Sequence, residues 1–151
     1  MNDVASHDGD NATTSPGAGV GIALGSFDMF HVGHLAAIRR AREAVDRIVL
    51  AVADDDLVRL VRGTDPVVAV AERVEVLEAF FPDAVIEVVA DTDVSDLVAR
   101  HEVGVAFVCC PSGGVPERVR SAPSVVALPF ETTSSVSLQL TLEPEILWTP
   151  R

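Results

Sequence analysis

The chain contains no lysine, and all eleven of its basic residues are arginine. Codon bias in the genome explains such a composition without any appeal to function. The absence still has a chemical consequence. Any site for an anion has to use guanidinium groups, backbone amides, the N-termini of helices or histidine.

Long apolar runs are also absent. No stretch approaches the roughly 20 residues that a bilayer-spanning helix needs. The first residues lack the basic start and apolar stretch of a secretory signal. A net charge of −12 argues against a broad positive surface for nucleic acid. We therefore expect a cytoplasmic protein that binds neither a membrane nor nucleic acid.

Cysteine is scarce, and the two cysteines, Cys109 and Cys110, are adjacent. Neighbouring residues of a strand point to opposite faces, so a disulfide between them would be strained. They also lack the spacing of metal ligands. We interpret them as buried thiols in a reducing compartment.

What is present is a regular alternation of two patterns. Short, nearly continuous β-branched runs predict strands that are buried on both faces, as in a parallel sheet; they cover residues 20–24, 48–53, 85–89, 103–108 and 125–128. Apolar residues at helical spacing predict helices between them, over residues 35–45, 70–81, 92–101 and 116–120. The alternation predicts an α/β fold: a doubly wound, parallel, five-stranded sheet with helices on both faces and the strand order 3-2-1-4-5.

One domain fills most of the chain. Residues 1–18 are polar and have hardly any aliphatic side chains, so we expect a disordered tail there. The folded domain is predicted to cover residues 19–142, followed by a C-terminal tail over 143–151. Ligands of doubly wound sheets lie at the carboxyl ends of the strands, where the strand order reverses. The loop that leaves the first strand is therefore the first place to look for a site.

That loop carries the most informative residues of the chain. It begins with Gly25, Ser26, Phe27 and Asp28 and continues to a histidine pair in the sequence His31-Val32-Gly33-His34. Gly25 permits a sharp turn, and Gly33 permits a phosphate to approach the backbone at a helix N-terminus. Histidines three positions apart face the same side of a helical turn. Imidazole N–H groups there can stabilise the charge of a reacting α-phosphate.

Two other interpretations of the histidine pair are surface residues and zinc ligands. No carboxylate or third histidine lies at zinc spacing, so a phosphate site is favoured. With these residues the chain resembles the HxGH nucleotidyltransferase superfamily, and within it the cytidylyltransferases typified by glycerol-3-phosphate cytidylyltransferase. The resemblance implies a Rossmann-like fold, a homodimer, Mg²⁺ bound with the nucleoside triphosphate, and release of pyrophosphate.

The resemblance also implies roles for individual residues. Ser26 and Phe27 would lie along the nucleotide, while His31 and His34 would stabilise the transferred phosphate. Arg73 would contact a phosphate of the nucleotide or the acceptor; the alternative is a solvated helix arginine. Two further arginines fall in a loop where the family binds substrate phosphate, although a surface salt-bridge cluster with the preceding aspartates explains them equally well; they are Arg59 and Arg62.

Two later segments depart from the family pattern. A hydroxyl cluster that would bind the triphosphate is present at Thr133, Ser134 and Ser135, but Phe130 stands where an arginine is expected. The segment after the fourth strand, which begins at Cys109, lacks the expected Gly-x-Asp acid. These departures leave three functions open. They are CMP transfer from CTP to a small phosphorylated alcohol such as glycerol 3-phosphate, AMP transfer from ATP to a phosphopantetheine-like, flavin or sugar-phosphate acceptor, and non-catalytic nucleotide binding.

Overall fold

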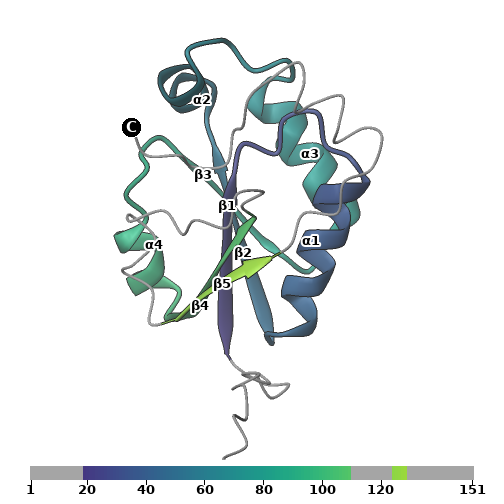
Figure 1. The fold of residues 1–151 in the computed structure, drawn as a ribbon, viewed down its shortest axis with the longest axis vertical. Helices are drawn as coiled ribbons and strands as arrows, with labels where there is room; N and C mark the ends of the chain where they lie inside the picture. The colour runs from purple at the N-terminus through teal and green to yellow at the C-terminus, as the bar shows by residue number, and fades with distance from the viewer. Residues whose placement is uncertain (1–18, 110–123, 129–151) are drawn as a thin grey trace, which may run out of the picture.

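The computed structural model describes residues 19–109 and 124–128 of this chain. Five strands form one sheet, and four helices pack on it (Figure 1); the strands are β1 (Val20–Gly25), β2 (Arg47–Ala53), β3 (Val85–Val89), β4 (Val103–Cys109) and β5 (Ser124–Leu128). All neighbouring strands are parallel, in the order β3-β2-β1-β4-β5. The fold class and the strand order predicted from the sequence are confirmed.

The strand sequences place apolar side chains on both faces of the sheet. Along β2, every second residue faces one core: Val49, Ala51 and Ala53 belong to one cluster. Ile48, Leu50 and Val52 belong to the other. Because successive side chains of a strand alternate between faces, a continuous apolar run fills two cores at once. The sheet therefore needs helices on both sides.

The helices divide between the two faces as this requirement predicts. Residues of α1 (Val32–Glu43) and α3 (Val70–Phe80) pack in one core, and residues of α2 (Asp55–Arg62) and α4 (Ser95–Arg100) pack in the other. In Figure 1, α1 and α3 lie to the right of the sheet and α4 lies to its left. Within residues 19–109, no helix combines the length and the apolar character that a membrane span requires.

The sequence analysis did not predict α2. It placed residues 55–62 in a loop, and that prediction was wrong. The signals for a helix were nevertheless present. Asp54 caps the N-terminus by accepting a hydrogen bond from the Leu57 N–H at 2.7 Å. Gly63 ends the helix in the left-handed conformation, with φ of 83°, as glycine commonly does. The helix expected at residues 116–120 and the tails expected at 1–18 and 143–151 lie outside the described residues.

Candidate functional site

The loop between β1 and α1 leaves the centre of the sheet at the carboxyl end of its middle strand. Its backbone is bent tightly: Phe27 and Met29 both have positive φ, 52° and 49°. Non-glycine residues avoid this region unless the surroundings hold them there. Here the Ser26 hydroxyl accepts a hydrogen bond from the Asp28 N–H at 3.2 Å, and Ser26 itself is buried. The loop is therefore held in one defined shape.

The structure brings the two predicted histidines together at the start of α1. His31 is the N-cap, and its Nδ1 accepts a hydrogen bond from the Gly33 N–H at 3.0 Å. In return, Nδ1 of His34 accepts from the His31 N–H at 3.2 Å. The two rings lie 4.1 Å apart between centroids, at 41°. This reciprocal capping fixes both rings at the helix N-terminus, where backbone N–H groups and the helix dipole favour an anion.

The capping bonds also decide which ring nitrogen carries the proton. Because Nδ1 of each histidine accepts a backbone N–H, a neutral imidazole here has its hydrogen on Nε2. Burial, followed by the nearby charge of His31, lowers the pKa of His34 to about 3, although Asp28 acts in the opposite direction. His34 is therefore a neutral hydrogen-bond donor at physiological pH.

Asp28, three residues before the first histidine, is held by protein groups on both carboxylate oxygens. Oδ1 accepts from the N–H groups of Val68 at 2.9 Å and Met29 at 3.1 Å. Oδ2 accepts from the Val67 N–H at 2.9 Å and from the Arg62 guanidinium at 3.0 Å. Burial by itself raises the pKa of Asp28, but these hydrogen bonds outweigh it and hold the pKa below its ordinary value. Asp28 thus fastens the α2–α3 connection to the histidine loop.

Sequence reasoning gave Asp28 no role, since nothing in the local sequence reveals partners about 40 residues away. The predicted substrate residue Arg62 is one of those partners, and its side chain is 5% exposed. Its neighbour Arg59 behaves differently. Arg59 lies on the surface and pairs with Asp56 and Asp65, so the predicted salt-bridge cluster is confirmed for it. Both arginines belong to α2 and not to a loop.

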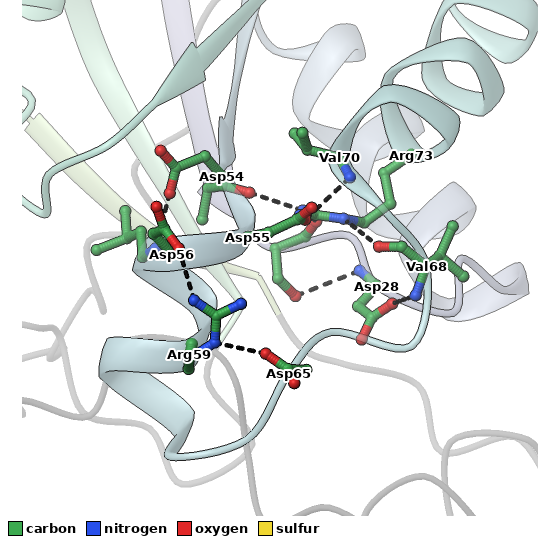
Figure 2. A network of polar contacts seen from close by, with 12 residues as sticks. Asp28, Asp54, Asp55, Asp56, Arg59, Asp65, Val68, Val70 and Arg73 are labelled. Atoms are coloured by element: carbon green, nitrogen blue, oxygen red, sulfur yellow. Dashed lines mark hydrogen bonds and ion pairs between the residues drawn. The ribbon is translucent and has the colours of Figure 1, made fainter.

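Arg73 lies in the first turn of α3 and is only 2% exposed, so the alternative of a solvated helix arginine is wrong. Its guanidinium donates to the carbonyl oxygens of Val68, Ser26 and Ala53 and to the carboxylate of Asp55. Figure 2 shows this network between α2 and α3. Four of its five N–H donors are thus used within the protein. Its predicted contact with a phosphate stays a prediction.

A cavity of about 420 Å³ opens beside the loop. Its walls come from the β1–α1 loop, the α2–α3 connection and α3, and they consist of Phe27, Met29, Phe30, Val68, Arg73 and Val76. The Phe30 ring stacks on His34 with centroids 5.4 Å apart and planes at 14°. The cavity therefore adjoins the histidine pair.

The structure describes only some of the other residues that were predicted to bind the nucleotide. Gly25 ends β1, and the Gly33 N–H donates to His31 as described. Thr133, Ser134, Ser135 and Phe130 lie outside the described residues, as do residues 110–114. In residues 19–109 and 124–128, no group of three or more His, Cys, Asp or Glu side chains is arranged to hold a metal ion.

Comparisons with known proteins support the predicted family. The family model described as cytidylyltransferase-like matches residues 22–111, more than half of the chain. A 55-residue segment is 38% identical to an FAD synthase of Thermococcus kodakarensis, covering 36% of this chain and 37% of that protein. An 86-residue segment is 40% identical to the bifunctional protein HldE of Bradyrhizobium diazoefficiens, covering 56% of this chain and 17% of that protein.

A solved structure extends the comparison to the fold. The lipopolysaccharide core biosynthesis protein from Thermoplasma volcanium superposes with a TM-score of 0.66 at 16% identity, covering 77% of this chain and all of that one. At such low sequence identity, the superposition supports a shared fold and nothing beyond it. The matched segments span little more than a third of the FAD synthases and a smaller part of HldE.

Proposed function

Because this chain belongs to the cytidylyltransferase-like family, we propose that it is a nucleotidyltransferase. It transfers a nucleotidyl group from a nucleoside triphosphate to a small acceptor and releases pyrophosphate. The observation that carries the proposal is the reciprocally capped pair of His31 and His34, which sets two imidazoles side by side at the N-terminus of α1.

In this reaction an oxygen of the acceptor attacks the α-phosphorus in line with the bond to the β-phosphate. A new P–O bond forms, the bond to the bridging oxygen breaks, and pyrophosphate leaves with the electron pair. Negative charge grows on the non-bridging and leaving oxygens. The Nε2–H groups of the two histidines donate to these oxygens, and the helix N-terminus adds backbone N–H groups. Since His34 is neutral at physiological pH, it acts as a positioned donor.

Mg²⁺, when bound, would neutralise the charge of the triphosphate. Asp28, the acidic residue of the loop, is poorly suited to hold it, because both of its oxygens already accept hydrogen bonds from the protein. We therefore propose that the ion arrives with the nucleotide and keeps the phosphates as its main ligands.

The nucleotide and the acceptor form the finer part of the proposal. CMP transfer to glycerol 3-phosphate follows from the resemblance of the histidine motif. AMP transfer is supported by similarity to FAD synthases, whose product contains an adenylyl group. The resemblance also implies a homodimer, which light scattering after gel filtration tests. Thermal stabilisation by ATP or by CTP separates the two nucleotides, since a ligand that binds only the folded state raises its stability.

The reaction is tested by pyrophosphate release. The full chain is incubated with Mg²⁺, with ATP or CTP, and with glycerol 3-phosphate, FMN, sugar 1-phosphates and phosphopantetheine. We expect release that depends on one nucleotide and one acceptor. Folded protein that gives no release with any pair would contradict the proposal and leave non-catalytic nucleotide binding as the function.

A further inference from the structure

We propose that the cavity between the β1–α1 loop and α3 binds a planar, apolar ring system of the acceptor, and that the acceptor is therefore a ring-bearing molecule of the flavin type, not a small polyol phosphate. This inference rests on the proposed nucleotidyl transfer and names the acceptor class for the same site. It depends on the position, the lining and the rigidity of the cavity.

The position separates the cavity from the place expected for the nucleotide. In doubly wound sheets the nucleotide lies where the strand order reverses, which here is between β1 and β4. Every described residue that lines the cavity comes from the segments following β1 and β2. The cavity thus lies on the other side of the histidine loop, and Phe30 joins it to His34. An acceptor bound there would reach the α-phosphate from beside the histidines.

The lining favours an apolar ring. Of the six described residues that line the cavity, five are apolar, and they include two phenylalanines and a methionine. Aromatic faces and the methionine thioether make favourable contacts with planar rings. The one charged residue, Arg73, already uses four of its five donors within the protein, including a salt bridge to Asp55 at 2.7 Å.

A phosphate or a polyol in this cavity would lose its hydrogen bonds to water and regain few of them from the walls. Such a loss costs free energy. A volume of about 420 Å³ also falls at the lower end of ligand pockets, roughly 300–1,000 Å³. The space therefore suits a ring system better than a charged headgroup or a whole dinucleotide.

The walls of the cavity are held in place by the surrounding protein. The bond from the Val68 N–H to Asp28 fixes the α2–α3 connection. Phe30 packs against Phe80 and Phe81, with ring centroids 5.6 and 6.4 Å away. Met29, which also lines the cavity, is 42% exposed to solvent. A preformed apolar pocket with one open side needs little rearrangement to bind a ring.

The test uses riboflavin as the probe, because it carries the ring without a phosphate and its fluorescence reports binding. The full chain is titrated into riboflavin with and without saturating nucleotide. Val76→Trp fills the cavity, and Glu75→Trp adds the same side chain at an exposed position of α3. We expect Val76→Trp to weaken binding by about tenfold or more and Glu75→Trp to change it by less than about twofold.

Met29→Ala keeps the test valid if Val76→Trp does not fold. Met29 is 42% exposed and lies outside the buried core, so this variant should fold and weaken riboflavin binding about threefold. Circular dichroism verifies the fold of each variant. Glycerol 3-phosphate at millimolar concentration should not displace the probe.

The outcomes separate this inference from the proposed function. Riboflavin binding that all variants leave unchanged, or displacement by glycerol 3-phosphate, would overturn the assignment of the cavity. Pyrophosphate release with a polyol phosphate whose KM is unchanged in Val76→Trp would overturn it too, while nucleotidyl transfer would stand. Riboflavin bound in the cavity without pyrophosphate release from any pair would uphold the ring site and count against the transferase.

Discussion

Two halves of one loop, only a few residues apart, use their polar side chains in opposite ways. In the first half, the carboxylate of Asp28 accepts hydrogen bonds from Val67, Val68 and Arg62. In the second half, the rings of His31 and His34 bond through Nδ1 to the backbone of their own helix turn. The Asp28 bonds reach across the fold, whereas the histidine bonds are local.

The difference indicates which half serves architecture and which serves chemistry. A buried carboxylate with all its bonds supplied by the protein stabilises the fold and has little capacity left for a ligand. A ring that is fixed through Nδ1 has a defined orientation and a defined Nε2–H, as a positioned donor requires. We therefore expect changes at Asp28 to affect stability first and changes at His34 to affect turnover first.

The largest effect is expected for Asp28→Ala. The substitution leaves the buried Arg62 guanidinium without its carboxylate and removes the acceptor of three backbone N–H groups. Removing one partner of a buried ion pair costs about 3–5 kcal/mol of unfolding free energy. Urea unfolding measures it. Asp28→Asn keeps one acceptor oxygen, so its free energy of unfolding should decrease less. Equal stability of the alanine variant and the parent would contradict the structural role of Asp28.

The next effect is expected on turnover, from two matched variants of His34. In His34→Asn, the amide oxygen can replace Nδ1 as the capping acceptor, but the Nε2–H is lost. In His34→Gln, a donor near the Nε2 position is kept and the capping acceptor is displaced. We expect the asparagine variant to keep its stability and to lose activity by on the order of 100-fold or more.

His34→Gln should retain more activity than His34→Asn and should be less stable, because a lost capping bond costs about 1 kcal/mol. Pyrophosphate release and urea unfolding measure the two properties separately. Activity that is unchanged in both variants would show that the histidine half of the loop takes no part in the chemistry.

A pH titration of stability separates the two halves. The pKa of His34 falls from its ordinary value near 6.5 to about 3 on folding, so below about pH 6.5 only the unfolded chain gains this proton. Stability should then decrease by up to about 1.4 kcal/mol for each unit of pH, until the pH approaches 3. The pKa of Asp28 is lowered for a different reason, because hydrogen bonds in the folded protein favour its charged form. This stabilising contribution is present at neutral pH and is lost only below about pH 4.

His34→Asn removes the loss of stability that His34 causes below about pH 6.5. It leaves the loss that Asp28 causes below about pH 4. The free energy of unfolding, measured between pH 7.5 and 4 in both proteins, should therefore decrease less steeply in the variant. Parallel curves would mean that His34 carries the same charge in the folded and unfolded chain, against its assignment as a buried neutral donor.

The smallest effect is expected for Arg59→Ala. Arg59 pairs with Asp56 and Asp65 on the surface of the helix that also carries Arg62. Exposed ion pairs contribute about 0–1 kcal/mol, so stability and turnover should both stay close to those of the parent. A loss of activity with intact stability would instead support the predicted role of Arg59 in substrate binding.

Local sequence patterns were sufficient to predict most of the framework. The five strands lie within one residue of their predicted bounds, and α3 ends at Phe80, one residue before its predicted end. The histidine pair was found because its spacing and its glycine act within a single helical turn. The prediction failed at α2, where the capping signals of Asp54 and Gly63 were present but were read as a loop.

The sequence by itself determined the layered α/β architecture and the place of the histidines, because strand alternation, helix periodicity and capping depend on residues close together in the chain. Only the tertiary structure decided what Asp28, Arg62 and Arg73 do. Several of their hydrogen-bond partners are brought from 18 to 47 residues away. Only folding buries these carboxylate and guanidinium groups and brings the distant partners to them. The cavity is likewise a product of three separate segments, so its shape and chemistry exist only once they are packed together.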